Sequence, residues 1–165
     1  MSDDAIHPQT HIGHVHLKVS DLDRAVKFYR DAFGFEVQQY FGRSAAFLSA
    51  GGYHHHIGLN TWESQGGSPP PYGTTGLYHF AILYPNRREL ARALKRLLDM
   101  GVPIDGAADH GVSEAIYLRD PDGTGIEIYA DRAPSEWPRD PSGELRMVTE
   151  PLDFDSLMAE LKDEG

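Results

Sequence analysis

The sequence predicts an α+β fold built from two consecutive modules, each with the order strand, helix and three strands. The first module spans residues 11–60 and the second spans residues 77–132. Each module opens with an apolar strand and an amphipathic helix that ends at a glycine, and a Gly-, Pro- and Ser-rich segment, Thr61–Gly76, separates the two. His14 and His79 also fall at equivalent places in the two opening strands. These observations indicate an internal duplication.

The first module begins with an alternating segment, His11–Val19, with one apolar face and one face that carries histidines. A helix follows, capped by Ser20 or Asp21 and ended by Gly34. Three short strands complete the module: Phe35–Tyr40, Ala45–Ser49 and Tyr53–Asn60.

The second module repeats this order. Leu77–Tyr84 reads as a strand, and Asn86 caps a helix that Gly101 ends. The last two strands are joined by a turn at Asp120–Gly123, where we expect Gly123 and the nearby Gly125 to accept a positive φ. The three strands after the helix are expected near Val102–Ile104, Ala115–Leu118 and Gly125–Tyr129.

The two ends of the chain flank this single domain. Residues 1–10 read as a polar arm, and residues 133–165 read as an irregular tail that ends in a short helix, Asp153–Lys162. The tail helix carries an apolar stripe, which we expect to pack on its own domain or on a partner subunit. The members of the stripe are Phe154, Leu157, Met158 and Leu161.

Composition excludes several classes of function. A net charge of −10 argues against nucleic acid as a partner. The absence of cysteine excludes disulfides, thiolate nucleophiles and cysteine-bound zinc. No apolar run has membrane-spanning length and no signal-peptide core is present, so we expect a cytoplasmic protein without a membrane partner. Because cysteine is absent and nine histidines are present, any metal would be held by imidazole and carboxylate.

Glu127 is the exception in an otherwise apolar strand. It lies between Ile126 and Ile128, where an uncompensated carboxylate would be costly to bury. Either a nearby cation or metal compensates this charge, or the side chain lies on the solvent face of an edge strand.

The two module openings, HVHLKVSDLDRAVKFYRDAFGFEV and YHFAILYPNRRELARALKRLLDMGVPI, resemble those of the vicinal oxygen chelate superfamily. That superfamily includes glyoxalase I, bleomycin-resistance proteins and extradiol ring-cleaving dioxygenases, and its fold is a cupped mixed sheet around a metal site. The stretch from His110 to Glu127 is similar to the narrower signature of extradiol dioxygenases, with one departure at Ala108. The segment GGYHHHIGLNTW also looks like bacterial catechol 2,3-dioxygenase-like proteins.

The resemblance implies a metal held by His14, His79 and Glu127. A two-His-one-carboxylate set leaves positions open on one face of the metal and suits Fe(II), with Mn(II), Zn(II) or Ni(II) as alternatives. Glyoxalase-like members usually take a fourth ligand from the last strand of the first module. Around the equivalent place this chain offers Gly58 and Asn60 and no carboxylate, although Glu63 lies just beyond if the register is shifted.

Extradiol enzymes use a histidine from the same strand as an acid–base group. Strand alternation puts His54 and His56 on the face of Gly58, so His56 is the first candidate and His54 the second, with ordinary surface or packing roles as the alternative. Tyr117 matches a tyrosine that hydrogen-bonds the bound substrate, and His110 matches a substrate-contacting histidine.

The sequence as a whole favours an extradiol-type dioxygenase of aromatic catabolism that acts on a catechol-like vicinal diol with dioxygen. The alternatives are a glyoxalase-like lyase or isomerase, and a non-catalytic drug-binding resistance protein. Because members with one pair of modules are commonly dimeric, we also expect a homodimer.

Overall fold

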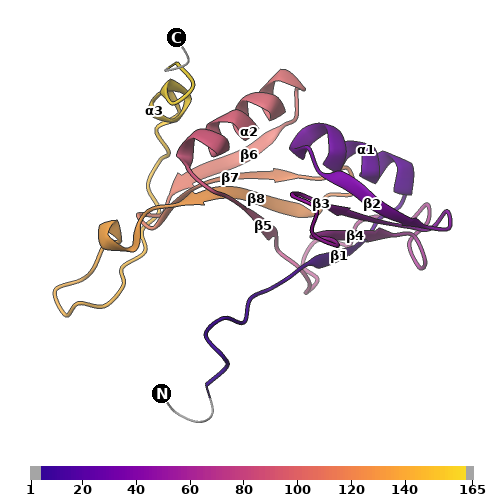
Figure 1. Cartoon of the computed structure of the whole chain (residues 1–165), viewed down its shortest axis with the longest axis horizontal. Helices are drawn as coiled ribbons and strands as arrows, with labels where there is room; N and C mark the ends of the chain where they lie inside the picture. The colour runs from indigo at the N-terminus through magenta and orange to yellow at the C-terminus, as the bar shows by residue number, and fades with distance from the viewer. Residues whose placement is uncertain (1–4, 163–165) are drawn as a thin grey trace.

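The computed structural model describes residues 5–162, so the first four residues of the predicted arm and the last three of the predicted tail lie outside it. Two four-stranded sheets make up the fold, which confirms the predicted α+β class (Figure 1). The first sheet has the order β1 (Val15–Lys18), β4 (Ile57–Asn60), β3 (Ala45–Ser49) and β2 (Glu36–Phe41). The second has the order β5 (Phe80–Tyr84), β8 (Gly125–Asp131), β7 (Ser113–Arg119) and β6 (Ile104–Asp109).

The two sheets share one topology. In each sheet the opening strand pairs in parallel with the last strand, and the other neighbours are antiparallel. Val15 of β1 lies opposite Ile57 of β4, as Phe80 of β5 lies opposite Ile126 of β8. The duplication read from the sequence is therefore a duplication of structure, and it makes Gly58 the structural equivalent of Glu127.

Both long helices lie on the same side of the sheets (Figure 1). The helix α1 (Leu22–Phe33) begins at Asp21, whose side chain accepts a hydrogen bond from the Arg24 N–H, and ends at Gly34 in the left-handed conformation (φ 81°). The helix α2 (Arg87–Asp99) begins at Asn86 in the same way. These boundaries follow the predicted caps because the capping groups satisfy backbone donors locally.

The buried faces of the helices and sheets form the core. Large side chains with no more than 2% of their surface exposed come from both modules. They are Tyr29, Leu48, Ile57, Leu59, Leu90, Leu94, Leu97, Ile116, Leu118, Ile126 and Ile128, together with Leu157 from the tail.

The β7–β8 turn of the second module is bonded to α1 of the first. Asp122 accepts hydrogen bonds from the Ser20 hydroxyl at 2.5 Å and from Arg24 at 2.6 Å. The buried carboxyl of Asp120 accepts a hydrogen bond from the Tyr29 hydroxyl at 2.9 Å and from the backbone N–H of Thr124 at 2.8 Å. Burial raises the pKa of Asp120 above its ordinary value, although these hydrogen bonds favour the charged form. The turn predicted from the sequence thus also connects the two modules.

Several predicted strand boundaries are wrong. The strand β4 begins at Ile57 rather than Tyr53, β5 begins at Phe80 rather than Leu77, and β6 runs Ile104–Asp109 rather than Val102–Ile104. The residues before β4 and β5 continue the apolar and aromatic pattern beyond the paired strands, although His56 still forms backbone bonds with Leu48 and Val15. Local pattern alone therefore overextends both strands.

The two turn glycines have different roles. Gly123 has a positive φ of 81°, as predicted, but Gly125 is absent from the residues with a positive φ. A Cβ at Gly125 would lie 2.2 Å from the backbone oxygen of Tyr78. Gly125 is therefore required by the close approach of two backbones rather than by the turn.

The tail packs on its own domain. After a short 3₁₀ turn, Pro134–Glu136, the chain ends in α3 (Phe154–Ala159), which packs against α2. Leu157 is fully buried and Met158 packs on the core, while Phe154 is 43% exposed. The apolar stripe is thus largely covered within one copy and lends little support to a homodimer, which stays a prediction. Among residues 5–162 no helix has the length and apolarity needed to span a membrane.

Tyr29→Phe tests the connection between the modules. The substitution leaves the buried Asp120 carboxyl without one of its donors, so we expect the free energy of unfolding to fall by about 1.5–3 kcal/mol. Urea denaturation followed by circular dichroism measures the change. Tyr84→Phe is the matched control, because Tyr84 pairs with Ala130 at the other end of β8 from the turn. Equal losses in the two variants would contradict a role for the Tyr29–Asp120 bond.

Candidate functional site

One face of the second sheet brings two of the three predicted metal ligands together. His79 directly precedes β5, and Glu127 lies in β8, the strand that pairs with β5. The His79 Nε2 atom is 2.9 Å from Oε2 of Glu127, whose side chain is 14% exposed. The carboxylate of Glu127 therefore has a close polar neighbour in His79, which balances its charge only when the imidazole is protonated.

Tyr117 and His110 extend this contact. Tyr117 in β7 lies directly opposite Glu127, and its hydroxyl is 2.7 Å from Nε2 of His110. Burial, and then the negative charge and hydrogen bond of Glu127, raise the pKa of Tyr117 above its ordinary value, so the phenol is protonated at neutral pH. A cavity of about 320 Å³, lined by His79 and Tyr117 together with Tyr78, opens beside the pair. Four of the predicted site residues thus form one continuous polar row.

His14 does not join this row within one copy of the chain. It directly precedes β1 in the other sheet, and its ring lies 4.4 Å from that of His55. Throughout residues 5–162, no three His, Asp or Glu side chains lie together in a group that could hold a metal ion. The convergence of His14 with His79 and Glu127 is therefore absent from the described part of a single chain.

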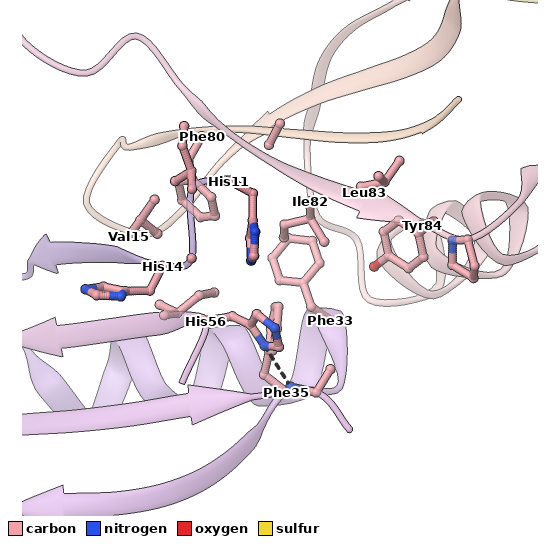
Figure 2. A pocket seen from close by; sticks show the side chains of 16 residues that line it. His11, His14, Val15, Phe33, Phe35, His56, Phe80, Ile82, Leu83 and Tyr84 are labelled. Carbon is pink, nitrogen blue, oxygen red and sulfur yellow. Dashed lines mark hydrogen bonds between the residues drawn. The ribbon is translucent and has the colours of Figure 1, made fainter. Parts of the chain in front are cut away.

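A larger cavity of about 630 Å³ lies between the modules. His14 and His56 reach it from the first module, whereas Phe80 and Ile82 belong to β5 (Figure 2). In Figure 2 the ring of His56 faces the apolar side chains, including Phe33, while the ring of His14 points away from them. The wall is mostly apolar, so this cavity suits an apolar group better than a charged one.

The three consecutive histidines lie in a loop rather than in a strand. Because β4 begins at Ile57, the predicted strand at His54 is wrong, although His56 still forms backbone bonds with Leu48 and Val15. The His56 Nδ1 atom accepts a hydrogen bond from the Ala50 N–H at 3.3 Å. The His54 ring lies instead against Tyr53, with its Nδ1 atom 2.7 Å from Nδ1 of His55.

His55 is the histidine that sequence reasoning missed. It contacts both His14 and Phe47, and Phe47 lies opposite Gly58 in the sheet. Burial and the neighbouring His14 lower the pKa of His55, which favours the neutral ring. No local signal identified it, since its place depends on a loop conformation.

The position equivalent to Glu127 in the first module holds no carboxylate. Gly58 occupies it, and a Cβ there would lie 2.9 Å from Cγ of His16, so the His16 ring fills the space. Glu63 does not replace the missing group, because it lies beyond β4 and pairs with Lys18 at 3.6 Å on the surface. The shifted register that would have brought Glu63 into the site is excluded by the pairing of β1 with β4.

Comparison with known proteins identifies the family of this fold. Residues 11–128 match the model of the Glyoxalase/Bleomycin resistance protein/Dioxygenase superfamily. The chain is 44% identical to a catechol-2,3-dioxygenase of Bacillus subtilis over 97% of its own length and 55% of that protein. It is 30% identical to biphenyl-2,3-diol 1,2-dioxygenase 3 of Rhodococcus globerulus over 73% of its length and 63% of that protein.

The chain therefore spans little more than half the length of these curated relatives. Among solved structures, a glyoxalase/dioxygenase from Nostoc punctiforme shares the fold with a TM-score of 0.64 at 19% identity, covering 81% of this chain and 100% of that one. The family model matches both modules, and the fold has the same two modules. The chain therefore belongs to the Glyoxalase/Bleomycin resistance protein/Dioxygenase superfamily.

Proposed function

We propose that this chain is a metal-dependent extradiol-type dioxygenase that cleaves the ring of a catechol-like vicinal diol with dioxygen. The observation that carries the proposal is the row formed by His79, Glu127, Tyr117 and His110 on one sheet face. It combines two metal-binding groups with two groups that exchange protons. The likeness to two curated proteins named as ring-diol dioxygenases supports the same class of substrate.

His79 and Glu127 fit two of the ligand positions of a divalent metal. An imidazole nitrogen and a carboxylate oxygen lie 2.9 Å apart beside a cavity, and this donor set suits Fe(II), with Mn(II), Zn(II) and Ni(II) as alternatives. A metal bound there would supply a Lewis-acidic centre at which the two vicinal oxygens of the substrate and dioxygen are held. Glu127 also balances part of the charge of that metal.

We propose that His14 of the partner subunit supplies the third ligand in a homodimer. Within one copy, the ring of His14 lies against that of His55 next to the other sheet, and it does not form a metal-binding group with His79 and Glu127. The two predicted histidine ligands directly precede β1 and β5, and both strands lie at sheet edges, where a second copy has access.

Tyr117 and His110 handle protons in this proposal. The Tyr117 hydroxyl can relay a proton: its oxygen accepts a proton from a substrate hydroxyl in the cavity as its own proton passes to the neighbouring His110 Nε2, and the reverse transfer returns the proton. His56 and His54 were the first candidates for this role. Within one copy, no hydrogen bond or ring contact among the described residues joins either of them to the row. His110 and Tyr117 already lie in it, so we assign the proton transfer to these two first.

The glyoxalase-like alternative lacks its fourth ligand. Gly58 stands where that ligand is expected, and Glu63 is held at the surface by Lys18. A three-ligand site leaves more positions for a bidentate substrate and dioxygen together. A drug-binding protein without metal would use the apolar cavity between the modules, but it would not need the row of His79, Glu127, Tyr117 and His110.

Oxygen uptake tests the proposed reaction. Protein reconstituted with Fe(II) without air, then given a catechol and oxygen, should consume oxygen and form a yellow ring-opened semialdehyde. Tyr117→Phe should lower turnover by roughly a hundredfold or more, because it removes a proton donor from the site. Metal-dependent conversion of a glutathione hemithioacetal, without oxygen uptake on a panel of catechols, would establish the lyase alternative instead.

Metal titration tests the ligands. Glu127→Ala should weaken metal binding by more than about a hundredfold, because two neutral imidazoles leave the charge of the metal largely uncompensated. Equilibrium dialysis against Mn(II) measures the change. Glu63→Ala is the matched control, since Glu63 is a carboxylate outside the proposed set. A Glu127→Ala protein that retains a full equivalent of metal would show the ligand assignment to be wrong.

Mixing two defective variants tests the shared site. His14→Ala and Glu127→Ala proteins should each bind little metal. After subunit exchange at equal concentrations, about a quarter of the wild-type metal content should return, because half of the dimers are mixed and each mixed dimer has one complete site. If His14 acts on the Glu127 of its own copy, every site in the mixture carries a defect and no metal binding returns.

A further inference from the structure

The tail beyond residue 132 reaches back to the proposed site. We call residues 146–150 the strap. Glu150 pairs with Asp109 as an antiparallel bridge, with both backbone hydrogen bonds formed, at 2.8 and 2.9 Å. The N–H of Val148 donates to the carbonyl of His110 at 3.1 Å. The strap thus pairs with the edge of the second sheet at Asp109 and His110. It lies outside the residues matched by the family model.

The strap also bonds the ring of His110. The Nδ1 atom of His110 lies 2.9 Å from the backbone oxygen of Val148. A carbonyl oxygen only accepts hydrogen bonds, so the proton of this pair is on Nδ1. The other nitrogen, Nε2, faces the Tyr117 hydroxyl at 2.7 Å. In the neutral ring, Nε2 is therefore the unprotonated nitrogen, and it faces Tyr117, its neighbour in the row.

The loop of residues 110–112, which joins β6 to β7 and carries His110, is held from both sides. Gly111 has a φ of 75°, and a Cβ at that position would lie 2.6 Å from Cγ of Pro138, so the tail packs directly on the loop. On the other side, Asp109 accepts hydrogen bonds from the Gly111 N–H at 2.8 Å and from two nitrogens of Arg132. The main chain on both sides of His110 is therefore held in place, which limits how far the ring can move away from Val148.

We propose that the strap is a positioning element of the active site and that the backbone carbonyl of Val148 holds His110 as the Nδ1–H tautomer. In this arrangement Nε2 is the atom that takes up a proton at Tyr117 and returns it. Val148 acts through His110 and does not touch the reacting groups. The mechanistic part of this inference rests on the proposed function, whereas the tautomer itself does not.

The test compares Glu150→Pro with Glu150→Ala in the full chain. Proline removes the N–H that donates to Asp109 and cannot fit the bridge, so it should detach the strap, whereas alanine keeps the backbone bonds. Long-range ¹H–¹⁵N spectra of metal-free protein labelled at histidine report which ring nitrogen carries the proton, and His110→Gln identifies the signals. We expect the Nδ1–H form of His110 in the wild-type protein and in Glu150→Ala, and its replacement by the Nε2–H form or a mixture in Glu150→Pro.

Turnover supplies a second measurement. Glu150→Pro should lower kcat by about tenfold or more while KM and metal content stay near their wild-type values, because only the proton-transfer geometry changes. If Glu150→Pro does not fold, Val148→Pro, which removes the Val148 N–H bond to His110, takes its place.

The outcomes separate the two proposals. An Nε2–H tautomer in the wild-type protein, or a tautomer unaffected in a folded proline variant, would overturn the positioning role. A tautomer that responds as expected in a protein without oxygenase activity would support the positioning of His110 and reject the proposed function.

Discussion

The compensation of one buried carboxylate organises the candidate site. Glu127 lies between two fully buried isoleucines in β8, and an unpaired carboxylate there would be strongly destabilising. The parallel pairing of β5 with β8 brings His79 within 2.9 Å, and the antiparallel pairing of β7 with β8 brings Tyr117 directly opposite. The pairing of the strands thus places His79 and Tyr117, the polar neighbours of Glu127, on one face of the sheet. In this structure His79 and Tyr117 are the polar neighbours of the carboxylate. In the proposed metal-bound form, His79 and Glu127 would hold the ion and Tyr117 would lie beside it.

The duplication is symmetric in backbone and asymmetric in chemistry. Gly58 and Glu127 are equivalent by register, but the first module fills the corresponding space with the ring of His16. The second module therefore has a carboxylate at this position. The first module has a glycine there, and the ring of His16 packs against its backbone. The bonds from Asp120 and Asp122 to α1 hold these unlike modules together, and the cavity between them has a mostly apolar wall. This asymmetry is the reason that we propose three protein ligands rather than four.

Features that depend on local sequence were predictable. The caps at Asp21 and Asn86 and the turn at Asp120–Gly123 are determined by neighbouring residues. Glu127 stood out as a carboxylate in an apolar strand, whereas its association with His79 came from the family resemblance. The segment from His54 to His56 was misassigned as a strand, because the aromatic pattern continues before the first residue of β4. The separation of His14 from His79 depends on how two modules pack, which no local pattern encodes. The strap was missed for the same reason, since the pairing of Glu150 with Asp109 joins segments far apart in the sequence.

The central claim is that the metal is held on the second sheet by His79 and Glu127. Anomalous scattering from crystals of the protein loaded with Mn(II) or Fe(II) locates the ion directly. The account predicts one ion within about 2.3 Å of both His79 Nε2 and a Glu127 carboxylate oxygen, with Tyr117 and His110 beside it. An ion bound instead among His14, His54 and His55 of the first module, with the His79–Glu127 contact unchanged, would contradict it.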